Sequence, residues 1–252
     1  FNSFIHKSLY FEKRIMSNFW DEQFPHDYYD KNLLKGLSIN RGLQSNWHNI
    51  TFLLAKKNIK TNTNHLDYAC GPGSFIGLYL ENNCIGIDIS KKQIEYAKEK
   101  YGDKGEFYEI NDFDFKQYKN YFDSITAIGL LEYLNDKETL LFLNQMEIIL
   151  KPGGKLMLTT PNYGLPMRLL EKVMHILGPI DYSSQHKNKH NFKSLSKLME
   201  MSDFNFKISK FMNIGVAFSI VNIDIGKSLN RVIEKITNRR FGFLFLVTAE
   251  KK

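Results

Sequence analysis

The stretch HLDYACGPGSF, residues 65–75, constrains the fold more than any other part of the sequence. A short, mostly apolar segment that contains Asp67 leads directly into two glycines on either side of Pro72. Glycine is favoured where the backbone needs a positive φ angle or must pass close to another group. A strand, a glycine turn and then the helix-like SFIGLYLE therefore indicate a turn shaped to lie against a ligand.

Strands and helices alternate after this turn. The predicted strands are HLDYAC, CIGIDI, GEFYEIN, FDSITAIG and GKLMLTT, and the predicted helices between them include SKKQIEYAKEKY and DKETLLFLNQMEIIL. Ser90 is the expected N-cap of the first of these helices, with Gln93 in the capping-box position, and KPGG is expected to end the second. This alternation predicts an α/β fold, with a doubly wound and mostly parallel sheet.

The remaining segments predict the domain organisation. Residues 1–64 are expected to form an N-terminal helical cap, because GLQSNWHNITFLLAKKNI carries apolar residues at helical spacing. Residues 65–252 are expected to form the core. Two insertions interrupt it, at about residues 161–191 after the fifth strand and at about residues 214–240 after the sixth.

Composition excludes several classes of protein. With 43% hydrophobic and 24% charged residues, the chain is typical of a globular protein, and no apolar run reaches the roughly 20 residues of a membrane span. No signal-peptide pattern is seen, and Cys70 and Cys84 are expected to be small buried residues, so we predict a cytoplasmic protein. The net charge of +7 comes without a nucleic-acid-binding motif, so no specific nucleic acid is expected.

The second predicted strand ends in Asp88, whose carboxylate would lie beside the glycine turn and can accept hydrogen bonds from both ribose hydroxyls. Sites for a dinucleotide and for a nucleoside methyl donor share this device. The dinucleotide pattern needs glycine at position 76, where this chain has isoleucine. Asp67 lies within the first strand and would hold an ammonium group. These features favour a methyl donor.

Four motifs in order, LDYACGPGSF, GIDIS, FDSITAIGLLEYL and LKPGGKLMLTTPN, resemble the class I S-adenosylmethionine-dependent methyltransferases. The ubiquinone-biosynthesis-like branch, which acts on small molecules, is the most similar, and the resemblance covers roughly residues 65–204. It implies a Rossmann-like, seven-stranded sheet whose seventh strand runs antiparallel beside the fifth. The C-terminal GFLFLVTAEK would form that strand.

The resemblance also implies a donor site for S-adenosylmethionine. Asp67 and the backbone of Ala69, Gly71 and Gly73 would surround its methionine portion. Tyr68-Ala69 departs from the family, in which isoleucine or valine followed by glycine is commoner, so we expect a slightly tighter pocket.

The other donor-binding residues follow the second, third and fourth strands. Asp88 would bind the ribose, and Ile89 would contact the adenine. The remaining positions implied are Asn111, Asp112 and Phe113 at the adenine edge, with Ile128 and Gly129 beside the sulfonium. Tyr28, Tyr29 and Arg41 of the cap either contact the donor or serve packing and solvation.

The acceptor side is less constrained. His190 is our predicted catalytic residue, as a base or an acceptor contact, with a loop-anchoring hydrogen bond as the alternative. His186 and His190 have the spacing of a metal pair but lack nearby acids, and Glu132 is followed by Tyr133 where some relatives have a metal-binding histidine. We therefore predict no metal.

The apolar insertions either extend the core or contact a lipid-like acceptor or a membrane. In the second case Lys227, Arg231, Lys235, Arg239 and Arg240 would face anionic headgroups. We expect a methyltransferase for a small-molecule or lipid-like acceptor, with O-methylation favoured and peripheral membrane contact as an alternative. A catalytically silent donor-binding partner and an NAD(P)-dependent reductase are the competing hypotheses.

Overall fold

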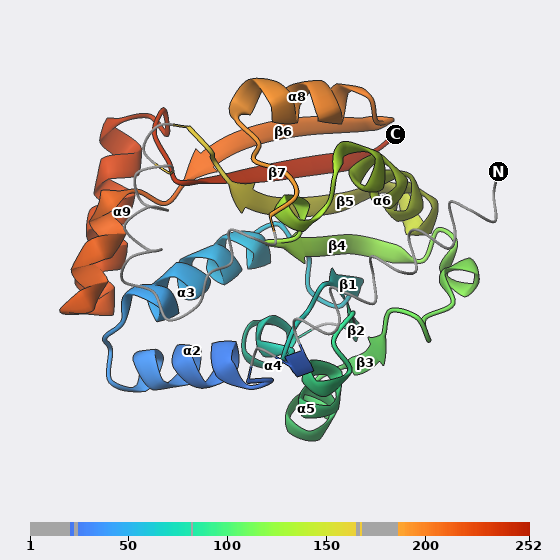
Figure 1. The fold of residues 1–252 in the computed structure, drawn as a ribbon, viewed down its shortest axis with the longest axis horizontal. Coiled ribbons are helices and arrows are strands. Elements are labelled where there is room, and N and C mark those ends of the chain that lie inside the picture. The colour runs from blue at the N-terminus through green and yellow to red at the C-terminus, as the bar shows by residue number, and fades with distance from the viewer. Residues whose placement is uncertain (1–20, 23–24, 82, 165–166, 168–185) are drawn as a thin grey trace.

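The computed structural model describes residues 21–22, 25–81, 83–164, 167 and 186–252. Within these residues seven strands form one sheet in the order β3-β2-β1-β4-β5-β7-β6, with helices on both faces (Figure 1). The predicted α/β class, the doubly wound sheet and the number of strands are confirmed. Most of the 161–191 insertion lies outside the described residues.

Strands β1 to β5 pair with one another in parallel. β7 pairs antiparallel with β5 on one side and with β6 on the other, as expected for the C-terminal strand. The strands are β1 (Asn64–Tyr68), β2 (Asn83–Asp88), β3 (Glu106–Glu109), β4 (Phe122–Ile128), β5 (Leu150–Pro161), β6 (Phe204–Phe211) and β7 (Leu244–Lys251). β5 includes the KPGG segment, which was predicted only to end the preceding helix.

The described helices divide between the two faces of the sheet. Those with assigned bounds are α2 (Tyr28–Ser38), α3 (Leu43–Lys56), α4 (Ser74–Tyr79), α5 (Lys91–Tyr101), η1 (Phe115–Tyr118), η2 (Leu131–Tyr133), α6 (Asp136–Ile149), α8 (Phe192–Glu200), η4 (Ile214–Ile220) and α9 (Ile223–Ile236). Apolar residues of α6 and α8 pack on one face in the largest core cluster. Residues of α3, α4 and α5 pack on the other.

Local sequence sets where two of these helices begin. The Ser90 side chain accepts a hydrogen bond from the Gln93 backbone N–H at the start of α5, which confirms the predicted N-cap. Asn135 and Glu138 form a reciprocal capping box at the start of α6. Both helices begin directly after a strand end or the loop that follows it, so they fix the positions of these loops.

The apolar face of α3 packs as predicted, on the β5–β7 side of the sheet. Trp47, Ile50 and Leu54 join a core cluster there, and Trp47 stacks on Phe243 with ring centroids 6.4 Å apart. Leu43 and Leu53, which were assigned to the same face, remain more than a third exposed.

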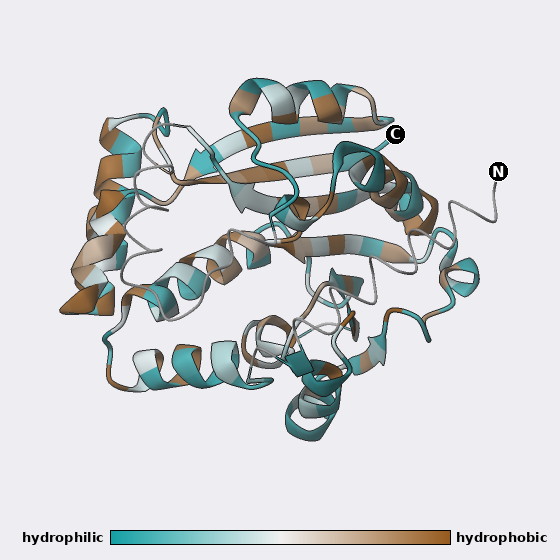
Figure 2. Cartoon of the chain, in the orientation of Figure 1, coloured by the Kyte–Doolittle hydropathy of each residue, from teal (hydrophilic) through white to brown (hydrophobic). Residues whose placement is uncertain are grey.

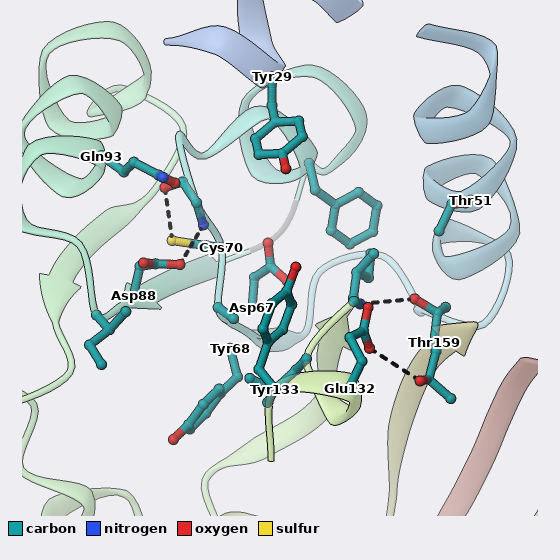
Figure 3. A pocket seen from close by; sticks show the side chains of 18 of the residues that line it. Tyr29, Thr51, Asp67, Tyr68, Cys70, Asp88, Gln93, Glu132, Tyr133 and Thr159 are labelled. Atoms are coloured by element: carbon teal, nitrogen blue, oxygen red, sulfur yellow. Dashed lines mark hydrogen bonds between the residues drawn. The ribbon is translucent and has the colours of Figure 1, made fainter. Parts of the chain in front are cut away.

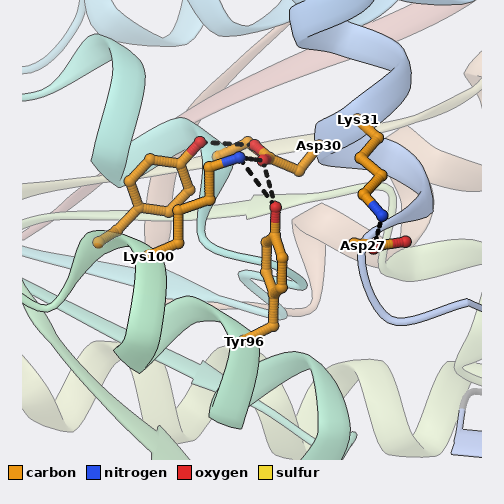
Figure 4. A network of polar contacts seen from close by, with 7 residues as sticks. Asp27, Asp30, Lys31, Tyr96 and Lys100 are labelled. Carbon is orange, nitrogen blue, oxygen red and sulfur yellow. Dashed lines mark hydrogen bonds and ion pairs between the residues drawn. The ribbon is translucent and has the colours of Figure 1, made fainter.

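A buried carboxylate joins α2 to helices α4 and α5 (Figure 4). Asp30 is fully buried and accepts hydrogen bonds from Ser74 Oγ (2.6 Å), Tyr96 OH (2.8 Å), Tyr101 OH (2.7 Å) and Lys100 Nζ (2.6 Å). Burial alone would raise the pKa of Asp30, but these hydrogen bonds outweigh it and lower the pKa below its ordinary value. α2 is therefore held to α4 and α5 by a charged network as well as by packing.

Candidate active site

A cavity of about 1070 Å³ opens at the carboxyl ends of β1, β2, β4 and β5. This is where ligands bind in open α/β sheets. Its volume lies at the top of the roughly 300–1,000 Å³ range of small-molecule sites, which leaves room for two ligands side by side. Figure 3 shows Tyr29, Asp67 and Tyr133 converging on the same space, with Asp88 on one side and Thr159 on the other.

The loop after β1 forms the floor of the cavity. The Gly71 backbone N–H donates to Asp88 Oδ2 at 2.9 Å, and the Ser90 N–H donates to Asp88 Oδ1 at 2.9 Å. Ala69 and Gly71 have positive φ angles of 62° and 54°. Glycine adopts this conformation at lower cost than alanine, which is the physical reason for the glycine commonly found at position 69 in the resembling family.

Gly73 supports the loop from below instead of lining the cavity. Its φ angle is 78°, and an added Cβ would lie 2.9 Å from the Phe107 ring and 3.0 Å from Ala97 Cβ. Only glycine lets α4 begin this close to α5 and β3. Gly73 thus shapes the loop through packing.

Asp67 ends a chain of polar side chains that crosses the sheet. Ser124 Oγ contacts His65 Nδ1, His65 Nε2 contacts Thr126 Oγ1, and Thr126 Oγ1 donates to Asp67 Oδ1 at 2.7 Å. Burial lowers the pKa of His65 to about 3, so its ring is neutral. Burial raises the pKa of Asp67 to about 7, although the Thr126 hydrogen bond opposes this.

Two further buried carboxyl groups line the cavity. Burial raises the pKa of Asp88 despite its backbone hydrogen bonds. Burial also raises the pKa of Glu132 to about 7, with Thr160 Oγ1 donating to Glu132 Oε2 at 3.1 Å. Within the described residues no lysine or arginine lines the cavity, and none forms an ion pair with these three carboxyl groups. The site is therefore suited to a cationic ligand.

Helices α2 and α3 supply a wall that the sequence did not assign to the site. Tyr29, Trp47, His48, Thr51 and Phe52 line the cavity from these helices. For Tyr29, contact with the methyl donor is one of two alternatives named from the sequence. The four α3 residues lie at i, i+1, i+4 and i+5. This spacing predicts that they share one face of the helix, but it does not predict what that face covers.

The structure brings most of the predicted donor-binding residues to one cavity. Its lining includes Asp67, Ala69, Gly71, Asp88, Ile89, Asn111, Ile128 and Gly129. The segment after β3 reaches it through Asn111. Asp112 is exposed, and Phe113 is buried with its ring stacked on Tyr118 at a centroid distance of 4.6 Å. Neither side chain belongs to the described lining.

His190 lies outside the described cavity lining. Its side chain is 1% exposed, and its ring nitrogens have no hydrogen-bond partner within the described residues. Burial lowers its pKa. Its backbone carbonyl accepts from the Tyr163 N–H at 2.9 Å. The Nδ1 atom of His186 lies 2.7 Å from the Tyr163 hydroxyl oxygen.

The described residues hold no group of three or more histidine, cysteine, aspartate or glutamate side chains arranged for a metal ion. Cys70, just after β1, and Cys84, in β2, are both buried, as the sequence predicts. In the part of the chain that the structure covers, no helix combines the length and apolar character needed to cross a bilayer.

Sequence comparison places residues 39–208 in a family described as a methyltransferase domain. An uncharacterised protein of Methanocaldococcus jannaschii is 31% identical over 147 residues. That alignment covers 58% of this chain, and the chain spans about three fifths (61%) of the relative's length.

Solved structures share the fold at low sequence identity. Magnesium protoporphyrin IX methyltransferase from Synechocystis PCC 6803, with bound SAH, matches with a TM-score of 0.59 and 15% identity over 95% of this chain and 100% of that one. Phosphoethanolamine N-methyltransferase 2 of Haemonchus contortus, in complex with S-adenosyl-L-methionine, matches with a TM-score of 0.58 and 16% identity. The match covers 93% of this chain and 59% of that one. A SAM-dependent methyltransferase from Archaeoglobus fulgidus matches with a TM-score of 0.53 and 20% identity, over 79% of this chain and 94% of that one.

Proposed function

The chain belongs to the methyltransferase domain family, and we propose that it transfers a methyl group from S-adenosylmethionine to an oxygen atom of a small or lipid-like acceptor. The observation that carries this proposal is the cavity with three buried carboxyl groups and no cationic side chain in its described lining. The donor brings an ammonium and a sulfonium cation to such a site. When bound, it supplies an activated methyl group for in-line displacement.

The residues fit this donor. Asp67 would hold the ammonium group, because a buried carboxyl with a pKa of about 7 gains an ion pair when a cation arrives. Asp88 would accept hydrogen bonds from the ribose while it keeps the Gly71 loop in place. The backbone of Ala69 and Gly71, with Ile89, Asn111, Ile128 and Gly129, would enclose the rest of the donor.

Glu132 is the best-placed group to take a proton from the acceptor. It lies on η2 directly after β4, and its Oε1 is 3.5 Å from where a Cβ on Gly129 would stand. Gly129 has a φ angle of 67° and leaves this approach open. A base with a pKa near neutrality is suited to deprotonating a hydroxyl group during methyl transfer. We therefore assign the base to Glu132 instead of His190, which the structure places outside the described lining.

The acceptor is proposed to be largely apolar. The part of the cavity beyond the donor loop is lined by Leu33, Trp47, Phe52, Leu130, Leu134, Leu141, Phe142 and Leu244. Thr51, Thr159 and Tyr133 add hydroxyl groups among them. Such a surface favours a mainly hydrophobic molecule with a few polar groups.

Two competing functions make different predictions. A dinucleotide would place a pyrophosphate beside the Gly71 loop, where the carboxyl groups of Asp67 and Asp88 would repel it. A silent partner would bind the donor but not turn it over. Calorimetry with S-adenosylmethionine and with NADPH, followed by turnover against a panel of phenols, hydroxy acids and amines, distinguishes the methyltransferase from the reductase and from the silent partner.

We predict that Asp88→Ala weakens donor binding by about 1.5–3 kcal/mol, which is roughly tenfold to 150-fold in dissociation constant. The change removes the ribose acceptor and also releases the N–H groups of Gly71 and Ser90. Isothermal calorimetry measures the affinity, and circular dichroism checks the fold. Asp103→Ala, an exposed carboxyl after α5, is the matched control and should bind as the parent does. Equal affinity in all three proteins would refute the assignment of Asp88.

A further inference from the structure

Two turns that are far apart in the sequence form one corner of the molecule, which we call the cap tip. It consists of residues 37–43, between α2 and α3, and residues 218–225, between η4 and α9. The Gly42 N–H donates to the Ser219 carbonyl at 2.7 Å, and the Ile223 N–H donates to the Asn40 carbonyl at 2.9 Å. Arg41 Nε donates to the Ile220 carbonyl at 2.6 Å. The two turns are thus held side by side.

The cap tip exposes an unusual amount of apolar side chain. Ile39 is 58% exposed and Val221 is 70% exposed, and Leu43, Ile220 and Ile225 are each more than a third exposed. Figure 2 shows hydrophobic colour at the α2–α3 connection and at the neighbouring end of α9. A cluster of exposed apolar side chains of this kind usually marks an interaction surface.

Basic residues lie near this apolar corner and along the rest of α9. Ile225, Val232 and Ile236 are exposed at i, i+7 and i+11 along α9, and Arg231 and Lys235 lie on the strip beside them. Over residues 35–43 and 218–240 the sequence has seven lysines and arginines, namely Lys35, Arg41, Lys227, Arg231, Lys235, Arg239 and Arg240, against the acids Asp224 and Glu234. Apolar side chains flanked by cations are complementary to an anionic lipid surface.

The cap tip shares two helices with the cavity. Leu33 and Trp47 line the cavity, and they lie one turn from Leu37 and Leu43 on α2 and α3. A bilayer that contacts the cap tip would therefore lie against the same pair of helices that form the cavity wall.

We propose that the cap tip is a docking surface for an anionic lipid bilayer. Ile39, Val221 and Ile225 would enter the interfacial region, and Arg231 and Lys235 would face the headgroups. The proposal deepens the proposed function, on which it rests for one point only: a lipid-like acceptor would be collected from the membrane.

Vesicle flotation tests the docking surface. We expect the parent protein to float with vesicles of phosphatidylcholine and phosphatidylglycerol at low salt, to be released as salt rises, and to ignore pure phosphatidylcholine. The Arg231→Gln, Lys235→Gln variant should bind anionic vesicles about tenfold or more weakly, because each cation near the surface adds to the attraction. The Ile39→Ser, Val221→Ser, Ile225→Ser variant should lose binding as well.

Control variants remove the same charge, and one exposed apolar side chain, elsewhere on the molecule. Lys193→Gln with Lys197→Gln changes two exposed lysines of α8, and Met201→Ser changes an exposed apolar residue after it. These variants should float like the parent. The proposal fails if the parent ignores anionic vesicles at low salt, if the control loses as much binding, or if the apolar triple variant converts a dimer to a monomer. In the last case the cap tip is an interface between two copies.

Calorimetry with S-adenosylmethionine, without vesicles, keeps the two proposals separate. The cap-tip variants should bind the donor as the parent does, because their substitutions lie outside the described cavity lining. Loss of flotation with intact donor binding supports the docking surface. Intact flotation in a protein that does not bind the donor would refute the proposed function alone.

Discussion

Glu132→Gln is expected to lower kcat about a hundredfold to ten-thousandfold, the usual contribution of general acid–base catalysis. The substitution keeps the size of the side chain and an oxygen that can accept from Thr160, and it removes the group that takes the proton. Donor affinity should stay within about twofold, since Glu132 is assigned to the acceptor. Initial rates at saturating donor, together with calorimetry, give both quantities.

The pH profile provides a second measure of Glu132. Burial raises the pKa of Glu132 to about 7, so the carboxylate is the minor form in mildly acidic solution and the major form in mildly basic solution. Activity of the parent should therefore rise with pH through about 7, and the variant should show no such step. Asp67 has a similar pKa of about 7, but a bound donor pairs it with a cation, so at saturating donor it should not titrate there.

Stability distinguishes a catalytic loss from unfolding. A raised carboxyl pKa means that ionised Glu132 costs folding free energy once the pH exceeds its ordinary value of 4.5. The glutamine variant removes that cost, and its melting temperature near neutral pH should be no lower than that of the parent. Glu147→Gln on α6 is the control and should turn over normally. A Glu132→Gln enzyme with parental kcat would exclude Glu132 as the base.

Asp30→Asn should lower the free energy of unfolding by about 3 kcal/mol, because a buried carboxylate with four donors is replaced by an amide that cannot accept from all of them. For a chain of this size that is roughly 6–12 °C in melting temperature. Lys100 is 35% exposed and can turn to water, so the loss falls at the lower end of the range for buried pairs. Thermal and urea unfolding measure it.

The control for Asp30 is on the same helix. Asp27 pairs with Lys31, which is 70% exposed, and such surface pairs contribute less than about 1 kcal/mol. Asp27→Asn should therefore melt within a few degrees of the parent. Since the pKa of Asp30 is lowered, its stabilisation is present above the ordinary value of 3.8 and disappears as the pH falls through the folded pKa. If both variants melt together at neutral pH, the network does not stabilise the fold.

The proposed donor side of the site was largely predictable from sequence, because most of its features are local. The glycine loop and the helix cap at Ser90 depend on neighbours within a few residues. Asp88 ends the second strand, and its carboxylate accepts from the Gly71 N–H, 17 residues earlier in the chain. The period of apolar residues gave the strands and helices, and parallel connectivity then brought the strand ends to one edge. The C-terminal strand also followed from the resemblance and was found where expected.

The proposed acceptor side was decided by tertiary structure. Thr160 meets Glu132 across β4 and β5, and Trp47 reaches the cavity from a helix that precedes the glycine loop. Asp30 accepts hydrogen bonds from side chains of α4 and α5, which lie 44 to 71 residues further along the chain. Such contacts leave no periodic or capping signal, because they depend on how whole elements pack. His190 shows the consequence: the sequence suggested a base or an acceptor contact, and packing buried its side chain outside the described cavity lining. Sequence determined where the glycine loop of the proposed donor site lies, and packing decided which side chains line the rest of the cavity.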